Sequence, residues 1–299
     1  MTNSPPTGAH PYAALEYGEA LGHIGQCIAV PEWDSFVLSR ALRHGDGEDA
    51  IGSYPLATLA RDADLRAGLK RLAEMGLVSL ILVPDPFHAP DRAQCERALD
   101  VCRPFKTHYL VDPAHSIEPT KHHRDRLRRG MRRCRVRQAR LADHLSAWKA
   151  LYSGLAQKHD IRGAAAFAPR YFEMLAANPL MTTFAAFVGE EIAAMTIWFA
   201  YDGVVYNHLT ASNAAGYANG ANFALYGAAI EHFRGEGVID LGGGSGFRDD
   251  PDDGLAAFKR GFSNARTQAL ICGAILDRER YRELARAKTN TDFFPAYRG

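Results

Sequence analysis

The string Phe258-Lys259-Arg260-Gly261-Phe262 contains the residues best suited to chemistry in this sequence. It places two cations between two aromatic rings, shortly after a glycine-rich stretch at residues 242–246. A fixed cation can stabilise the negative charge that develops on a carbonyl oxygen under nucleophilic attack. Lys259 is our candidate for this role. The alternative is an amphipathic helix end on which Lys259 and Arg260 are both exposed to water.

The glycine-rich stretch, GGGSG at residues 242–246, follows a short apolar run. It lacks the Gly-Lys-Ser/Thr ending of a nucleotide P-loop, and Phe247 occupies the third glycine position of the dinucleotide-binding pattern. Ser245 is not set in the Gly-x-Ser-x-Gly context of a hydrolase nucleophile. The glycines therefore predict either a bend where another backbone approaches closely, or a floor for a substrate with Gly243 as the contact.

An amine that attacks a carbonyl must also lose a proton, so a base is needed. His208 and Asp240 are candidates on two predicted strands, and Tyr206 could orient the substrate. The alternative is that these side chains belong to the core or to a sheet face. The histidines form no His-Glu-x-x-His or His-x-His cluster, so we expect no metal site.

Residues 121–140 (KHHRDRLRRGMRRCRVRQAR) hold ten basic residues and one acid, a local balance of +9 in a chain of net charge +1. Such focused positive charge predicts a contact with a polyanion. Four arginines recur at helical spacing and would form one charged face: Arg128, Arg129, Arg132 and Arg133. The alternative is a solvated helix that links two domains.

The composition is that of an ordinary globular protein, with 47% hydrophobic and 23% charged residues, and 299 residues suit two domains. The five cysteines form no Cys-x-x-Cys pair, so we expect free thiols rather than a zinc ribbon or a redox dithiol. Cys95 and Cys102 are predicted to share one face of a helix. No apolar run approaches the ~20 residues of a membrane span, and no signal peptide is evident, so we expect a cytoplasmic protein.

Hydrophobic periodicity and turn residues predict an alternation of helices and strands. The predicted helices cover residues 64–76, 93–102, 121–140, 144–158, 169–176, 222–234 and 278–288, and the predicted strands cover 77–83, 105–111, 183–188, 192–201, 204–210, 238–241 and 267–276. Three antiparallel strands followed by a strand–helix–strand crossover imply a mixed sheet with helices on both faces.

The second half of the chain resembles a GNAT acyltransferase domain. From about residue 50 to the end, the chain resembles the FemAB-like tandem GNAT group, which includes the peptidoglycan-bridge-type aminoacyltransferases. The segments that carry the resemblance are GSYPLA (52–57), GLVSLILVPDPF (76–87), HHRDRLRRGMRRCRVRQ (122–138), VIDLGGG (238–244), AFKRGF (257–262) and FFPAYR (293–298).

The resemblance implies an α/β fold of two tandem GNAT-like domains, each a mixed twisted sheet flanked by helices. We place the N-terminal domain at residues 12–135 and the C-terminal domain at residues 136–277. The last residues, 278–299, are expected to pack back on the first domain.

The same resemblance implies a transferase that moves an acyl or aminoacyl group onto an amine and forms an amide. The donor would be aminoacyl-tRNA, gripped by the four arginines, and the acceptor a small-molecule or peptide-like amine; no cofactor is expected. The catalytic Phe-Lys pair of the family maps onto Phe258 and Lys259. Tyr54, in the GSYPLA segment, and Arg170 join the substrate-binding candidates.

Two alternatives stay open at this point. An acyl-CoA-dependent enzyme of this topology would hold a pyrophosphate on the backbone of residues 213–221, but that loop contains no lysine or arginine. The chain could also be a non-catalytic binding module on a degenerate GNAT fold, because GSYPLA departs from the Ser-Pro-Tyr-Gly element of the family.

Overall fold

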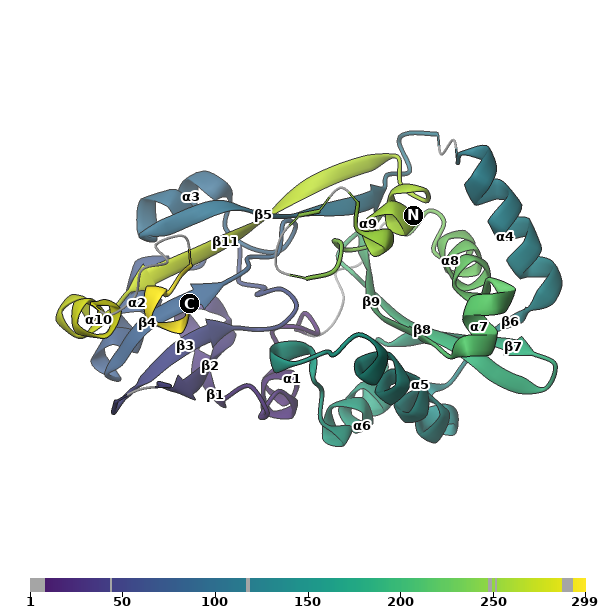
Figure 1. The fold of residues 1–299 in the computed structure, drawn as a ribbon. Helices are drawn as coiled ribbons and strands as arrows, with labels where there is room; N and C mark the ends of the chain where they lie inside the picture. The colour runs from purple at the N-terminus through teal and green to yellow at the C-terminus, as the bar shows by residue number, and fades with distance from the viewer. Residues whose placement is uncertain (1–8, 44, 117–118, 247–248, 251, 287–292) are drawn as a thin grey trace. The chain divides into compact units, whose positions relative to one another are not determined.

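The computed structural model describes residues 9–43, 45–116, 119–246, 249–250, 252–286 and 293–299, which form two compact units (Figure 1). Among the described residues, unit 1 is built from residues 106–267, and unit 2 from residues 9–105 together with residues 268–299. Two strands, β5 (Val101–Val111) and β11 (Ala265–Ile275), have residues in both units.

This division differs from the boundary that we expected between residues 135 and 136. The basic helix α4 (Lys121–Arg133) belongs to unit 1 because it packs on α8 (Ala221–His232). The two helices approach so closely that a Cβ at Gly130 would lie 2.5 Å from the main-chain oxygen of Gly220. Tertiary packing therefore assigns the basic helix to the second half of the chain.

Unit 1 contains a six-stranded mixed sheet. Its strands lie in the order β5, β10 (Val238–Asp240), β9 (Val204–Ser212), β8 (Glu191–Tyr201), β7 (Thr182–Val188) and β6 (Arg135–Ala139). β10 is parallel to β9 and antiparallel to β5, and the other neighbours are antiparallel. The meander and crossover predicted from the sequence are therefore present. Strand β6 lies at the end of the basic segment, where the FemAB-like resemblance predicts a short strand that closes the basic helix.

Helices cover both faces of this sheet (Figure 1). On one face lie α4, α7 (Ala214–Asn219) and α8, and on the other lie α5 (Leu145–Lys158) and α6 (Pro169–Ala177), with the short turns η2 (Leu141–His144) and η3 (Gly163–Ala165). The small apolar residues of α8 allow it to sit close to the sheet, where Trp198, Val205 and Tyr226 are buried in one cluster. The remaining helix, α9 (Gly254–Arg260), contains the Phe-Lys pair.

The strands of unit 2 pair in the order β1 (Gln26–Val30), β2 (Ser35–Ala41), β3 (Glu48–Gly52), β4 (Leu77–Leu82) and the second part of β11. α2 (Leu65–Glu74) and α3 (Arg92–Ala98) pack on one apolar cluster, and α10 (Arg278–Ala285) and η4 (Ala296–Arg298) pack on another. α1 (Leu15–Ala20) and η1 (Pro31–Trp33) lie against β1 and β2. No described helix is both long and apolar enough to cross a membrane.

One predicted helix is too long. We expected a helix over residues 93–102, but α3 ends at Ala98 and Cys102 lies on β5. The reason is tertiary: the carboxylate of Asp100 accepts the main-chain N–H of Ile275 (2.8 Å) and pairs with Arg278 (2.7 Å). Cys102 therefore shares no helical face with Cys95; its sulfur contacts that of Cys272, 3.4 Å away.

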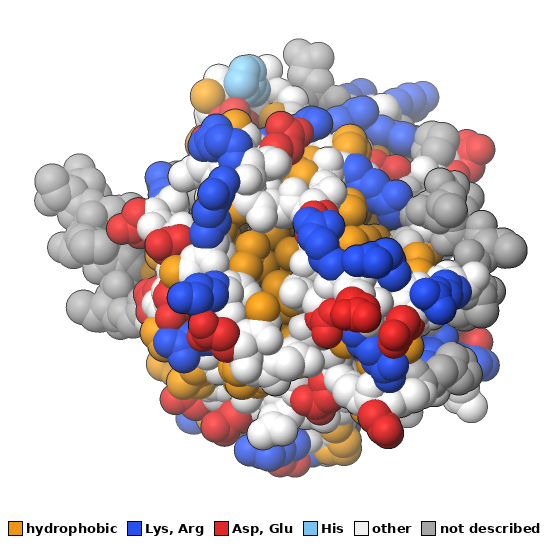
Figure 2. Space-filling view, turned by 90° about the vertical axis from the view of Figure 1, so that its left-hand side faces the viewer, with side chains coloured by type: hydrophobic (Ala, Val, Ile, Leu, Met, Phe, Trp, Pro, Cys, Tyr) orange, Lys and Arg blue, Asp and Glu red, His pale blue; other side chains and the backbone are white. Residues whose placement is uncertain are grey.

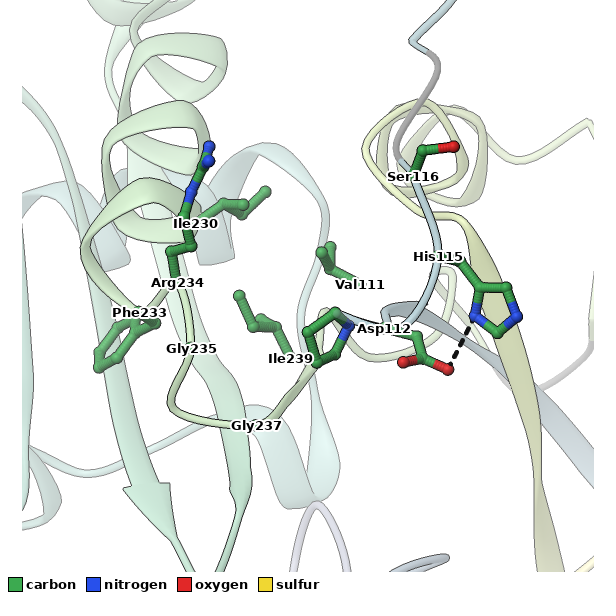
Figure 3. Close-up of a pocket in the computed structure, with 11 residues that line it drawn as sticks. Val111, Asp112, His115, Ser116, Ile230, Phe233, Arg234, Gly235, Gly237 and Ile239 are labelled. Atoms are coloured by element: carbon green, nitrogen blue, oxygen red, sulfur yellow. Dashed lines mark hydrogen bonds and ion pairs between the residues drawn. The ribbon is translucent and has the colours of Figure 1, made fainter. Parts of the chain in front are cut away.

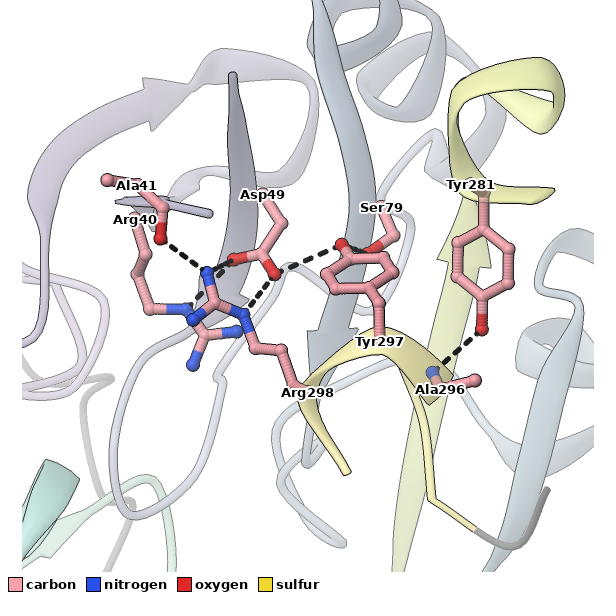
Figure 4. A network of polar contacts seen from close by, with 8 residues as sticks. All are labelled: Arg40, Ala41, Asp49, Ser79, Tyr281, Ala296, Tyr297 and Arg298. Atoms are coloured by element: carbon pink, nitrogen blue, oxygen red, sulfur yellow. Dashed lines mark hydrogen bonds and ion pairs between the residues drawn. The ribbon is translucent and has the colours of Figure 1, made fainter. Parts of the chain in front are cut away.

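A buried polar network fixes the C-terminal residues to the sheet of unit 2 (Figure 4). The side chain of Asp49 on β3 is fully buried between the guanidinium groups of Arg40 (3.0 Å) and Arg298 (2.9 Å). The hydroxyl of Tyr297 also donates to this carboxylate (3.1 Å) and lies 2.7 Å from that of Ser79. One carboxylate thus satisfies two cations and one hydroxyl that are mostly removed from water.

We expect Asp49→Asn to destabilise the protein by about 3–5 kcal/mol, because it leaves two largely buried guanidinium groups without a countercharge. Urea unfolding followed by circular dichroism measures the change. The matched control is Glu48→Gln, at the exposed neighbouring position of the same strand, which should change the free energy of unfolding by less than about 0.5 kcal/mol. Equal effects of both substitutions would contradict this account.

Candidate active site

The polar side chains of unit 1 with the greatest capacity for chemistry meet at the carboxyl end of β10. The ladder between β10 and β5 continues past the strand: the N–H of Leu241 donates to the oxygen of Tyr109 (2.9 Å), and the N–H of Tyr109 donates to that of Gly242 (3.2 Å). This register brings the residues of β5 that precede Tyr109 alongside residues 242–246, which we call the glycine segment.

His108 on β5 and Asp240 on β10 form a buried pair. Nδ1 of His108 lies 2.8 Å from Oδ2 of Asp240, and the residues are 9% and 2% exposed. The second carboxylate oxygen, Oδ1, accepts the main-chain N–H of Gly242 (2.7 Å). The sequence predicted Asp240 at the site as a candidate base. The structure instead makes Asp240 the hydrogen-bond partner of His108, a histidine that the sequence analysis missed.

Two lysines hold the glycine segment. The ammonium of Lys259, on α9, donates to the oxygen of Gly243 (2.8 Å), and that of Lys106, on β5, donates to the oxygen of Ser245 (2.6 Å). Lys259 is only 8% exposed, so the interpretation of it as a solvated helix-end residue is wrong, whereas Arg260 is exposed. The carbonyl dipoles of the glycine turn stabilise two cations that are otherwise costly to bury.

Burial lowers the pKa of Lys259 to about 8, although the carboxylates of Asp240 and Asp253 oppose the shift and the charge of Lys106 adds to it. Because the pKa of a lysine in the unfolded chain is higher, the unfolded state binds more protons between pH 8 and about 10. The penalty for burying this charge is therefore fully present below pH 8 and is relieved as the pH rises above that value. The folded protein retains a cation at position 259 at a cost in stability.

Asp253 positions α9 and thereby Lys259. Its carboxylate caps the helix by accepting the N–H of Ala256 (2.8 Å), and it also accepts the N–H of Ser245 (2.9 Å) and the hydroxyl of Ser245. Partial burial raises the pKa of Asp253, but these hydrogen bonds prevail and hold it below its usual range. One side chain thus joins the start of α9 to the glycine segment.

The ring of Phe258 lies in an aromatic cluster. Its ring packs edge-to-face on Phe223 and Tyr226 of α8, 4.9 and 4.8 Å between centroids. His123 of α4 joins the cluster, and its Nε2 lies 3.0 Å from the main-chain oxygen of Phe258. Gly261 is required there, because a Cβ would lie 1.9 Å from that imidazole. The structure therefore gives Phe258 and His123 a packing role that sets the position of α9.

The structure surrounds His208 with protein. It is 8% exposed, and its Nε2 lies 2.6 Å from the hydroxyl of Tyr171 on α6. Burial lowers the pKa of His208 to about 3, so it is neutral and weakly basic. Tyr206 stacks on Phe199 of β8, 4.8 Å between centroids, and Arg170 is exposed on α6. The strand histidine proposed as a base thus has the position of a core residue.

The other predicted site residues lie in two places. Arg128, Arg129, Arg132 and Arg133 are all exposed on α4 of unit 1. Tyr54 belongs to unit 2, where burial raises its pKa and its main-chain oxygen accepts the hydroxyl of Tyr17 (2.7 Å). The structure therefore brings Lys259, Asp240 and Gly243 together and adds Lys106, His108 and Asp253 to them.

One group among the described residues could hold a metal ion: His10, Asp85 and His88, all buried in unit 2, with ligand atoms within 4.8 Å of one another. However, Nδ1 of His10 accepts the main-chain N–H of Tyr12 (3.1 Å), which puts the proton of the neutral ring on Nε2, the atom nearest Asp85. In this arrangement Nε2 carries the proton and faces Oδ2 of Asp85 across 4.0 Å, which is an electrostatic contact and too long for a hydrogen bond.

A hollow of about 400 Å³ lies at the opposite end of β10 (Figure 3). Val111, Ile230 and Ile239 form its apolar walls, and the rim carries Arg234 together with His115, whose Nδ1 lies 3.1 Å from a carboxylate oxygen of Asp112. Because Asp240 and the glycine segment follow the other end of the three-residue strand, this hollow is separate from the lysines described above.

Comparisons with known proteins agree with this fold. Residues 121–260 match the model of the acetyltransferase (GNAT) domain family, and a search of curated proteins gave no match. FemX is a structural neighbour at 13% identity, with a TM-score of 0.63 over 94% of this chain and 95% of that one.

Two further neighbours have similar scores. The C-terminal domain of a putative lysylphosphatidylglycerol synthetase from Agrobacterium fabrum aligns at 15% identity, with a TM-score of 0.61 over 87% of both chains. L-PGS from Bacillus licheniformis aligns at 14% identity, with a TM-score of 0.59 over 90% of this chain and 94% of that one. The predicted fold class and the FemAB-like resemblance are thereby confirmed at the level of the fold.

We expect Asp253→Ala to lower the free energy of unfolding by about 1–2 kcal/mol, because α9 loses its cap and the glycine segment loses an acceptor. Amide hydrogen exchange should accelerate selectively in residues 254–260. Asp252→Ala is the matched control, since that neighbouring carboxylate is exposed and does not cap the helix. Unchanged exchange in α9 of the Asp253 variant would contradict the positioning role.

Proposed function

We propose that this protein is an N-acyltransferase that forms an amide bond by direct attack of an amine on an activated carbonyl. The observation that supports this most strongly is the buried ammonium of Lys259 beside the glycine segment. One of its N–H groups is engaged by Gly243, and an ammonium has three. The others can stabilise the oxyanion that forms when the nitrogen adds to the carbonyl carbon, a contribution of about 3–4 kcal/mol for one well-placed donor.

The donor that we favour is aminoacyl-tRNA. α4 presents its four arginines to solvent on a helix with a single acid, and a polyanion binds such a helix through its phosphates. The face shown in Figure 2, which is the left-hand side of Figure 1, differs from α4 in its charges. There, basic and acidic side chains are mixed around an apolar strip. The similarity to FemX and to synthetases of lysylphosphatidylglycerol supports an aminoacyl group as the part transferred.

Acyl-CoA is less well accommodated. The N–H of Gly216 at the start of α7 is already accepted by the side chain of Asn213 (2.9 Å). The start of α8 is covered by α4 through the contact between Gly130 and Gly220. A pyrophosphate would need these helix starts to be open, so the packing argues for a donor that is held elsewhere.

The acceptor that we propose is a small-molecule or peptide-like amine, and the reaction needs no cofactor and no covalent enzyme intermediate. The amine nitrogen forms a bond to the carbonyl carbon of the donor. The bond between that carbon and the ribose oxygen breaks, and the ribose oxygen leaves with the proton that the amine has lost. A cytoplasmic location accords with a tRNA donor. A non-catalytic binding module is the remaining alternative, and substitution of Lys259 distinguishes the two.

We expect Lys259→Met to reduce kcat/KM by about 10²–10³-fold while leaving the melting temperature unchanged or higher, since it removes both an oxyanion donor and a buried charge. Turnover of the wild type should also fall above pH 8, as the ammonium loses its proton. Initial rates with a panel of charged tRNAs and amines test both points. Turnover that rises through pH 8, or survives in the variant, would contradict the role of the cation.

We expect the double substitution Arg132→Gln and Arg133→Gln to weaken binding of charged tRNA at low salt, with a slope of log K against log salt reduced by about 1–2. Filter binding at several salt concentrations measures it. The matched control is Arg66→Gln with Lys70→Gln, two exposed cations of α2. Salt-independent binding, or a stoichiometric micromolar calorimetric signal with acetyl-CoA, would favour the acyl-CoA alternative instead.

A further inference from the structure

The pair formed by His108 and Asp240 has the geometry of an oriented base. Asp240 is held from two sides, by Nδ1 of His108 (2.8 Å) and by the N–H of Gly242 (2.7 Å). A carboxylate only accepts hydrogen bonds, so the proton of the neutral imidazole lies on Nδ1. The lone pair of the ring is then on Nε2, at the far edge from the carboxylate.

That far edge lies beside the glycine segment. A Cβ at position 243 would lie 3.6 Å from Cδ2 of His108, the ring carbon bonded to Nε2. The oxygen of the same Gly243 accepts the ammonium of Lys259. A proton acceptor and a cation thus flank one glycine, at a position where the main chain packs closely on β5.

We propose that His108 is the catalytic base that takes the proton from the attacking amine, and that Asp240 is its positioning residue. The inference rests on the proposed acyl transfer and deepens it. As the nitrogen bonds to the carbonyl carbon, its proton passes to Nε2 and the carbonyl electron pair moves to the oxygen beside Lys259. When the carbon–oxygen bond to the leaving group breaks, Nε2 returns the proton to the departing oxygen, so the imidazole is regenerated.

The other candidates for the base fit less well. Lys259 carries the cation that the oxyanion needs, and a pKa of about 8 keeps it protonated at neutral pH. His208 faces Tyr171 and is too weakly basic. Asp240 has both carboxylate oxygens occupied by donors, and its side chain is 2% exposed.

Charged groups lie around His108 on three elements. Asp240 pairs with it from β10, Lys106 lies two residues before it on β5, and Lys259 of α9 donates to Gly243, which lies beside the imidazole. The carboxylate of Asp253 lies near both lysines. Lys259 works only when charged, so the rate should fall as the pH rises above about 8.

The first test is His108→Asn. The asparagine amide can still donate to Asp240 but has no atom in the place of Nε2. We expect kcat to fall about 10²–10⁴-fold with KM changed less than about threefold. Asp240→Asn should lower kcat by a similar factor, because an amide donor to Nδ1 moves the proton onto Nε2. His159→Asn, at an exposed position, is the control. A kcat of His108→Asn that stays close to that of His159→Asn would overturn the proposal.

The second test is independent of turnover, and so separates this inference from the proposed function. Long-range ¹H–¹⁵N spectra of the histidine side chains, with His108 assigned by its loss in His108→Asn, report which nitrogen carries the proton. We expect the Nδ1–H form in the wild type and the Nε2–H form in Asp240→Asn. An Nε2–H form in the wild type would overturn the assignment even if acyl transfer is demonstrated. An Nδ1–H form in a protein inactive with every donor would refute the transferase and leave the oriented imidazole in place.

Discussion

The hydrogen-bonded ladder between β5 and β10 determines where every group of the candidate site lies. β10 has only three residues, but the ladder extends beyond it to Gly242, and this extension aligns Lys106 and His108 with the glycine segment. Residues more than 130 positions apart in the sequence are thereby placed within hydrogen-bond distance. If this register shifted by one residue, His108 would turn to the opposite face of the sheet, and the pair with Asp240 would be lost.

The site also illustrates a conflict between stability and chemistry. A methylene chain with no charge would pack at position 259 at lower cost, yet the fold gives this ammonium the carbonyl oxygen of Gly243 and two nearby carboxylates. The same carboxylates hold other parts of the site: Asp253 caps α9, and Asp240 binds His108 and Gly242. The polar groups therefore form one connected network, in which Asp240 and Asp253 each accept hydrogen bonds from two other members.

The sequence predicted much of the fold of unit 1, because alternation, turn dipeptides and glycine stops are local signals. It predicted Lys259, Gly243 and Asp240 at the site for the same reason, since all three lie close together along the chain. It missed His108 and Lys106, which share one face of a predicted strand and meet the glycines only through pairing in space. The sequence also predicted His208 at the site. This prediction was wrong because the sequence around a strand histidine does not show that Tyr171, from a separate helix, contacts it. The sequence also extended the helix of α3, since the contacts that Asp100 makes with Ile275 and Arg278 stop the helix through residues far away in the sequence.

The discontinuity of unit 2 has a consequence for synthesis on the ribosome. Unit 1 is complete once residue 267 has left the exit tunnel, whereas unit 2 still lacks a strand of its sheet and the guanidinium that neutralises Asp49. Until then, β4 has no partner on one edge and Asp49 lacks the guanidinium of Arg298, although the residues that carry both have long been synthesised. Because synthesis runs from the N-terminus, the unit whose residues are translated first is the last to acquire its native structure.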